Sequence, residues 1–281
     1  MQVEGWKYYN HAMIPTTVPN DAADMRPIES GVIWKKWGGT PLLARWTTDW
    51  DCGHKTNWWY VIKDTPFDIK ELKAKRRYEI NKGNKNFEVR VINPCEYKEE
   101  LYRVQTAAFS AYPSKYRPSV VKGNFLMEVE DWVKYDVFGA FFKETNELAG
   151  YALLKARNDS FLELPVLKTA PSLERYAINA ALVYGILSHY EEFLRSGGII
   201  CDGSRSINHE THFQDYLEKY FGFRKAYCYL HVQYNPKIKC LINGLFPLRK
   251  TLDSFDGIGI IHSINSVLKM EEICRGEALD E

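Results

Sequence analysis

The order of elements expected between Phe87 and Tyr234 constrains the fold of this 281-residue chain more than any other feature. Apolar alternation predicts a strand at 87–92, and helical periodicity predicts a helix at 97–111. Two apolar strands at 137–142 and 148–156, joined by the polar segment 143–147, are typical of a hairpin. Strands at 161–167, 199–201 and 226–234 then alternate with helices at 173–194 and 211–221. This succession predicts an α/β (α+β) fold with a mixed, mostly antiparallel sheet flanked by helices.

Pro165 lies inside the strand expected at 161–167. A proline cannot donate a hydrogen bond to a neighbouring strand, so it is confined to edges and bulges. We therefore expect a bulge or a splayed edge at this position. The helix that follows is apolar on more than one side, which indicates burial against the sheet.

Tryptophan is unevenly distributed along the chain: seven of the eight residues fall within the first 59 positions. Large aromatic side chains can hold a short segment onto a neighbouring sheet, so residues 1–67 are expected to form a small Trp-rich N-terminal half. Alternatively, some of these rings line a groove for an acceptor substrate. The candidates for that groove are Trp34, Trp37, Trp46 and Trp50.

A basic helix is expected at 68–83. Asp68 and Glu71 resemble a capping box at its start, and Gly83 stands where a helix commonly ends. Seven basic residues stand against two acidic ones over 70–85, although the whole chain carries a net charge of only +1. The segment is either a solvated helix face or an anion-binding surface, and for the latter the candidate residues are Lys73, Arg76 and Arg77. It is expected to link residues 1–67 to a domain at 87–236, with a helical tail at 237–281.

Composition excludes several other classes of protein. The near-neutral net charge disfavours a dedicated nucleic-acid binder. The six cysteines show no CxxC pair, and the N-terminus has neither the basic nor the apolar part of a secretory signal, so we expect a cytoplasmic protein with reduced thiols and no membrane span. His209 and His212 lack a third ligand, and their spacing is one residue short of the HExxH motif, so no metal is expected.

From Phe87 to Pro236 the succession resembles the GNAT acyltransferase fold. The segment 216–224, with the sequence YLEKYFGFR, is similar to the helix-to-strand passage near the C-terminus of that family. Residues 72–83, followed by NFEVR at 86–90, are similar to the FemAB branch, in which a basic helix joins a first acyltransferase-like half to a second. The loop 167–175 contains no glycine, unlike the usual GNAT pyrophosphate loop.

This resemblance implies an N-acyltransferase. Its co-substrate would be an acyl-CoA such as acetyl-CoA, and its acceptor an amine of a sugar, a peptide or a cell-envelope precursor. Two alternatives stay open: a FemAB-like enzyme that takes its acyl group from aminoacyl-tRNA, and a non-catalytic GNAT-like protein that binds a ligand.

A GNAT-like site would hold the thioester carbonyl on a backbone N–H near the bulge, which makes Val166 and Leu167 the candidate donors. A helix beginning near Ser172 would direct its free N–H groups at a phosphate. Lys168 and Arg175 would supply part of what the missing glycines provide in the family.

Two carboxylates and a phenol are the candidates for proton transfer. Glu163 precedes the bulge and Asp202 ends the next strand, so either can act as the general base. The tyrosine that serves as the general acid in the family corresponds to Glu218. Tyr216 and Tyr220 flank that position, and Tyr220 is the candidate acid.

Overall fold

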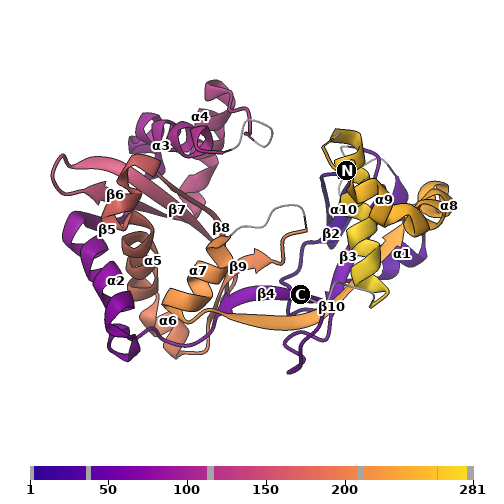
Figure 1. Cartoon of the computed structure of the whole chain (residues 1–281), viewed down its shortest axis with the longest axis horizontal. Coiled ribbons are helices and arrows are strands. Elements are labelled where there is room, and N and C mark those ends of the chain that lie inside the picture. Colours follow the sequence, from indigo (N-terminus) through magenta and orange to yellow (C-terminus); the bar gives the residue numbers. More distant parts are fainter. Residues whose placement is uncertain (1–2, 36–38, 113–116, 208–211, 258, 277–281) are drawn as a thin grey trace. The chain divides into compact units, whose positions relative to one another are not determined.

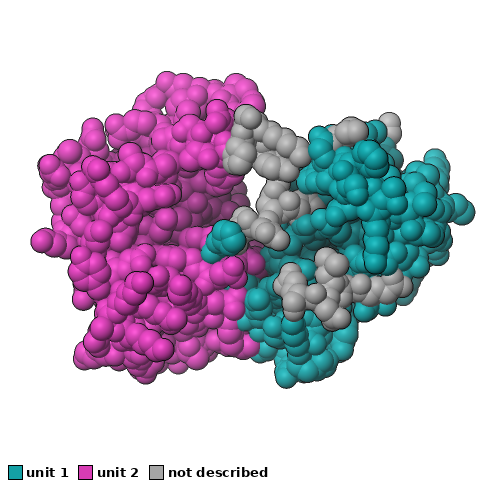
Figure 2. Space-filling view, viewed as in Figure 1, with its two compact units in different colours: residues 1–61, 204–212, 225–281 teal, residues 62–203, 213–224 magenta. Residues whose placement is uncertain are grey.

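The structure is a computed structural model that describes residues 3–35, 39–112, 117–207, 212–257 and 259–276. Ten strands form a mixed, mostly antiparallel sheet in the order β1-β2-β3-β10-β4-β9-β8-β7-β6-β5. The chain divides into two compact units, which are described separately. Unit 1 comprises residues 1–61, 204–212 and 225–281, and unit 2 comprises residues 62–203 and 213–224 (Figure 2). Within the described ranges, no helix combines the length and the apolar character needed to span a membrane.

Unit 2 contains the strands expected in the middle of the sequence, and their antiparallel order from β5 to β8 is confirmed (Figure 1). Successive residues of a strand point to opposite faces of the sheet, and in β6 and the first two thirds of β7, apart from the first residue of each, the residues of both faces are buried. The strands are β5 (Phe87–Ile92), β6 (Asp136–Phe142), β7 (Glu147–Asn158), β8 (Phe161–Thr169) and β9 (Ile199–Ser204).

Helices cover both faces of the unit 2 sheet. On one face, Leu101 and Val129 pack with Tyr151 in a buried cluster beneath α3 and α4. On the other face α5 lies against β5, β6 and β7, and α2 packs on α5. The helices are α2 (Ala74–Asn86), α3 (Lys98–Ser110), α4 (Lys122–Glu130), α5 (Ile178–His189), α6 (Glu191–Arg195) and α7 (His212–Phe221).

The basic helix differs from the prediction at both ends. Asp68 caps only a short 3-10 turn at Ile69–Glu71, where its carboxylate accepts a hydrogen bond from the Lys70 N–H (2.8 Å). The backbone is then extended at Leu72 and Lys73, and α2 begins at Ala74. Gly83 does not end the helix, which continues to Asn86. Gly83 is buried, and because it has no side chain, α2 can pack closely on α5 at this position.

Unit 1 combines both ends of the chain. Its strands are β1 (Trp6–Tyr9), β2 (Ala12–Pro15), β3 (Leu43–Thr48), the first residues of β4 (Trp58–Lys63) and most of β10 (Arg224–Tyr234). Its helices are α1 (Arg26–Glu29), α8 (Pro236–Leu245), α9 (Arg249–Asp253) and α10 (Gly259–Cys274).

The tail is an integral part of unit 1. Leu268 and Met270 of α10 share one buried cluster with Leu43 and Trp58. The sequence predicted four successive segments, whereas residues 1–61 and the tail form one unit because they bury apolar surface against each other and against β10.

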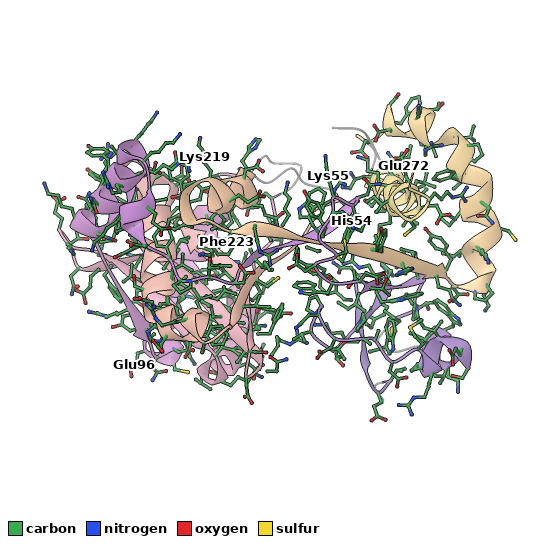
Figure 3. The ribbon with its side chains drawn as sticks, turned by 90° about the horizontal axis from the view of Figure 1, so that it is seen from below. His54, Lys55, Glu96, Lys219, Phe223 and Glu272 are labelled. Atoms are coloured by element: carbon green, nitrogen blue, oxygen red, sulfur yellow. The ribbon has the colours of Figure 1, made fainter. Side chains whose placement is uncertain are left out.

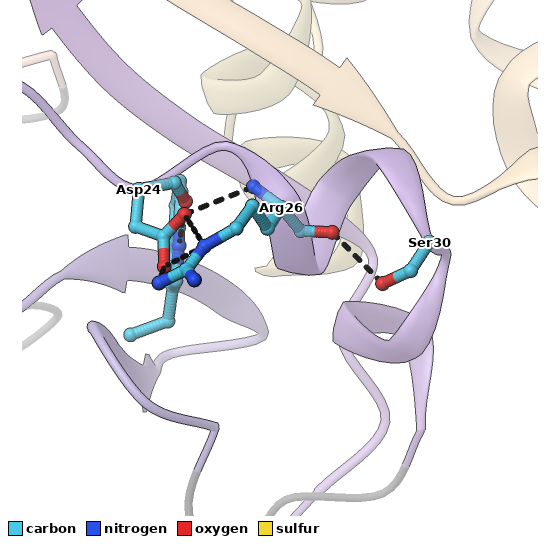
Figure 4. Close-up of polar contacts among 4 residues, drawn as sticks. Asp24, Arg26 and Ser30 are labelled. Atoms are coloured by element: carbon cyan, nitrogen blue, oxygen red, sulfur yellow. Dashed lines mark hydrogen bonds and ion pairs between the residues drawn. The ribbon is translucent and has the colours of Figure 1, made fainter.

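Most of the described tryptophans serve packing. Trp6 is 1% exposed in a second cluster with Met13 and Ile33, and Trp34 and Trp46 lie against that cluster. Trp37 lies outside the described residues. This cluster is held by polar contacts near α1, where the Trp6 indole donates to the Asp24 carbonyl (2.7 Å). The Asp24 carboxylate in turn accepts from the Arg26 N–H and guanidinium (Figure 4).

Candidate active site

The candidate site lies in unit 2 where β8 and β9 separate. The two strands pair in parallel only from Phe161 opposite Ile199 to Glu163 opposite Cys201, after which β8 continues to Thr169. On its other edge β8 pairs with β7, where Glu163 lies opposite Lys155 and Val166 lies opposite Leu153. Three steps along β8 therefore match two steps along β7. The extra residue is the bulge expected at Pro165, which is confirmed. Glycine at position 203, with a φ of +125°, then turns the end of β9.

The register of β8 decides which backbone N–H groups face the gap. The Ala170 N–H donates to the Ala149 carbonyl of β7 (2.8 Å). Because the direction of backbone hydrogen bonds alternates along an antiparallel pair, the N–H of Val166 also faces β7, whereas that of Leu167 faces the side that β9 has left. Of the two predicted oxyanion donors, Leu167 therefore has its N–H directed at the gap.

Asp202 follows Cys201, the last residue of β9 that pairs with β8, and so lies immediately beside the separation. Burial raises the pKa of its carboxyl from the ordinary 3.8 to about 6, and a smaller, opposing effect comes from a hydrogen bond donated by Gln214 of α7 (3.3 Å). Among the described residues Asp202 forms no ion pair. A carboxyl that titrates near pH 6 can accept a proton from an amine at neutral pH.

Glu163, the other predicted base, is already engaged. Both of its carboxylate oxygens accept hydrogen bonds from the Arg157 guanidinium, at 2.8 and 2.9 Å. The structure thus brings Glu163 and Asp202 to the same point of the sheet but leaves only Asp202 without a cationic partner among the described residues. The sequence does not predict the contacts of Gln214 and Arg157. Gln214 lies on α7, twelve positions from Asp202, and Arg157 lies on β7, across the turn from Glu163.

The loop after β8 differs from the expected start of a long helix. Pro171 begins a 3-10 turn that ends at Tyr176, Ala177 adopts a left-handed conformation (φ 63°), and α5 starts only at Ile178. A second break at Tyr190 separates α5 from α6, so the single helix predicted at 173–194 is wrong.

This break changes the setting of the predicted phosphate-binding residues. Ser172 and Arg175 are exposed on the 3-10 turn rather than at the N-terminus of a long helix. Lys168 lies on the other face of the sheet, where its ammonium group donates to the Tyr112 hydroxyl (3.1 Å) and lies over the Phe109 ring. The structure does not bring Lys168 together with the other two.

Tyr220 contacts α2 instead of the gap. The Arg76 guanidinium lies 5.8 Å from the centre of the Tyr220 ring. Partial burial and then the nearby Glu79, which hydrogen-bonds with the phenol, raise the pKa of Tyr220. The Tyr220 ring also contacts the ring of Tyr216 in a tilted arrangement, with the ring centres 4.8 Å apart. The Tyr216 hydroxyl is buried and has no hydrogen-bond partner among the described residues.

The other predicted anion-binding residues lie on exposed parts of the same helix region. Lys73 precedes α2 and Arg77 lies on its solvent side. Within the ranges that the structure describes, no basic residue of this segment forms an ion pair; the segment carries Lys70, Lys73, Lys75, Arg76, Arg77, Lys82 and Lys85.

Among the described residues, no group of three or more His, Cys, Asp or Glu side chains is placed to hold a metal ion. His209 lies outside the described residues, so the pair with His212 has no structural description.

Comparison of the sequence with models of known protein families gives no match, and comparison with curated proteins gives none. Solved structures are similar in fold. L-PGS from Bacillus licheniformis is 12% identical, with 85% of this chain and 83% of that chain covered and a TM-score of 0.52. The C-terminal domain of a proposed lysylphosphatidylglycerol synthetase from Agrobacterium fabrum is 11% identical, with 83% and 81% covered and a TM-score of 0.49.

A proposed acetyltransferase of the GNAT family from Desulfovibrio desulfuricans is 14% identical over 40% of this chain and 69% of that chain, with a TM-score of 0.30. At these identities the similarity concerns the fold alone. The fold is the mixed, mostly antiparallel, helix-flanked sheet of the GNAT type that the order of elements predicts.

Proposed function

We propose that the chain is an N-acyltransferase that moves an acyl group from acyl-CoA to an amine at the separation of β8 and β9. The observation that carries the proposal is the juxtaposition of a bulged strand, a backbone N–H at Leu167 directed at the gap, and the Asp202 carboxyl beside it. These are the groups that direct aminolysis of a thioester needs.

The proposed reaction has one bond-forming and one bond-breaking event. The thioester oxygen accepts a hydrogen bond from the Leu167 N–H while the amine nitrogen attacks the carbonyl carbon. Asp202 takes the proton of the attacking amine, and the C–S bond breaks. A thiol with a pKa of about 8.5 leaves readily and can be protonated by water, so a side-chain acid is not required. Tyr220 stays a candidate acid only if its contacts with α2 change.

Removing the Leu167 N–H tests the oxyanion role. We expect Leu167→Pro to lower thiol release from acetyl-CoA in the presence of an amine by about a hundredfold, because one lost oxyanion donor typically has an effect of this size. The N–H of Leu167 does not pair with β7, so the strand ladder loses nothing. The measurement is thiol release across a panel of sugar, peptide and small amines.

Val166→Pro is the matched control, because its N–H does face β7 and its loss weakens the sheet rather than the site. The unfolding midpoint separates the two variants. Leu167→Pro should keep a normal midpoint and lose activity, whereas Val166→Pro should have a lowered midpoint. Calorimetry that detects no binding of acetyl-CoA or of longer acyl-CoAs would exclude the CoA form of the proposal.

A specific observation favours a second candidate donor, aminoacyl-tRNA. The segment 70–85 carries seven cationic side chains without ion-pair partners among the described residues, and Tyr78 among them is 69% exposed. Cations that lie close together along the chain and form no ion pairs can neutralise RNA phosphates, and an exposed ring can stack on a base. This donor would keep the site at the β8–β9 separation and replace the thioester with an ester.

The salt dependence of tRNA binding distinguishes this donor. Lys75→Glu combined with Arg77→Glu is expected to reduce the slope of log affinity against log salt by about 1.5, as the loss of two phosphate contacts requires. Lys134→Glu combined with Lys237→Glu is the control, since both lysines are exposed elsewhere. A weak affinity for tRNA, with the same slope of log affinity against log salt in both double variants, would argue against aminoacyl-tRNA as the donor.

A further inference from the structure

Unit 1 contains a cavity of about 1100 Å³ that the proposed reaction does not use. It runs beside β10 and is bordered by residues 55–57, which lead into β4, by α8 and by the end of α10. Every lining residue belongs to unit 1. Trp46 contributes one wall and stacks on His231 with the ring centres 5.4 Å apart; Lys55, labelled in Figure 3, contributes to the rim.

The cavity follows one backbone edge of β10. The other edge is occupied by β3, which pairs in antiparallel register from Thr48 opposite Tyr229 to Leu43 opposite Tyr234. The Asn235 N–H donates to the Leu42 carbonyl (2.8 Å), so by alternation the backbone groups of residues 229, 231 and 233 face β3. The N–H and C=O groups of residues 230, 232 and 234 therefore face the cavity side.

β4 covers only the earlier part of this edge. The Thr56 hydroxyl, two residues before β4 begins, donates to the Cys228 carbonyl (2.7 Å). Beyond that point the edge is met by a side chain of α10: the Cys274 thiol donates to the Leu230 carbonyl (3.2 Å) and accepts from the Val232 N–H. One thiol thus contacts two groups that a neighbouring strand would otherwise pair.

The rim of the cavity is positive. The charge of Arg275 is compensated by an ion pair with Glu271, in which Nε lies 2.8 Å from Oε1. Lys55 and Lys239 are both exposed, and neither has an ion-pair partner in the part of the chain that the structure describes. Exposed strand edges are sites where extended peptides add by backbone pairing, and side chains beside the edge select the sequence.

We propose that an acidic, extended segment of a partner protein adds to this edge of β10. Its backbone pairs with residues 230–234 and displaces the Cys274 thiol, and its carboxylates meet Lys55 and Lys239. Five strand residues span about 17 Å, so the segment is about five or six residues long.

The test uses the full chain and a fluorescein-labelled hexapeptide of alternating glutamate and valine with blocked ends, followed by fluorescence anisotropy. Saturable binding is expected. A second peptide, with proline in place of valine, has the same charge but loses every second backbone N–H and cannot form a regular ladder with the edge, so it should bind at least about tenfold more weakly. A lysine–valine peptide should not bind measurably.

Two double variants locate the binding. Lys55→Glu with Lys239→Glu is expected to weaken the acidic peptide about tenfold or more. Lys237→Glu with Lys250→Glu, which alters exposed lysines of α8 and α9 that do not line the cavity, should leave the affinity unchanged. Equal binding of the proline peptide would overturn strand addition, and equal binding of the lysine peptide or equal effects of both double variants would overturn the charge argument. Absence of saturable binding at millimolar peptide would overturn the proposal itself, and none of these results depends on acyl transfer.

Discussion

Asp202→Asn is expected to lower the rate of acyl transfer by about 10² to 10⁴, the usual range for the loss of a general base. The asparagine keeps the shape of the carboxyl and its contact with Gln214 but cannot accept the proton of the amine. In the unmodified chain, kcat/KM should fall as the pH drops below about 6, because burial raises the pKa of Asp202 to about 6 and the base is then protonated. A pH–rate profile of thiol release measures both effects.

The same substitution should stabilise the folded chain at neutral pH. An acid whose pKa is raised by folding favours its protonated form in the native state, so its contribution to stability is complete below pH 3.8 and is lost as the pH rises through about 6. A difference of about two pKa units corresponds to about 2–3 kcal/mol at pH 8. Urea unfolding of Asp202→Asn should therefore show a gain of this order at pH 8 and almost none at pH 4.

Asp159→Asn is the control for both measurements, since Asp159 is an exposed carboxyl on the turn between β7 and β8. It should change neither activity nor the pH dependence of stability. If thiol release is established and Asp202→Asn retains full activity with an unchanged acid limb, Asp202 is not the base. If no acyl donor binds at all, the ligand-binding alternative gains, because the raised pKa would then reflect burial alone.

The elements found from the sequence are those whose pattern is local. The alternation at 87–92 coincides with β5, because the period of a strand is carried by adjacent residues and needs no distant contact. The breaks at Ala177 and Tyr190 were missed, since an apolar helix pattern continues across them without a marker. The union of the N-terminal half with α10 was also missed, because it rests on contacts between residues more than two hundred positions apart.

The candidate site was predictable only in part. Pro165 marks the bulge in the sequence, and the two carboxylates beside it follow from their positions at strand ends. The distinction between Glu163 and Asp202 depends on Arg157, which pairs with the former across the β7–β8 turn. The choice of Leu167 over Val166 depends on the register of β8, which no sequence motif records.

Gly83 illustrates how tertiary contact overrides a local signal. Its position after a periodic segment predicts the end of a helix, yet α2 continues through it to Asn86. A Cβ at this position would lie 2.6 Å from the Ala177 carbonyl oxygen and 2.9 Å from the Ala181 nitrogen. Both are backbone atoms of the neighbouring segment, so neither can rotate away.

Gly83→Ala is therefore expected to destabilise unit 2 by about 3 kcal/mol, at the upper end of overpacking effects, although alanine favours an isolated helix. The two helices must move apart, and α5 also lies on β5 through Gly185, so the strain reaches the sheet. Gly123→Ala in α4 is the matched control. Beyond the chain neighbours and the backbone of its own helix, no described atom lies within 4 Å of the added methyl group, so stability should be unchanged or raised by up to about 1 kcal/mol. Urea unfolding of both variants measures the contrast. Equal midpoints would mean that α2 does not rest on α5 at this distance. The link between the basic helix and the rest of unit 2 would then have to be sought in the contact of Arg76 with Tyr220.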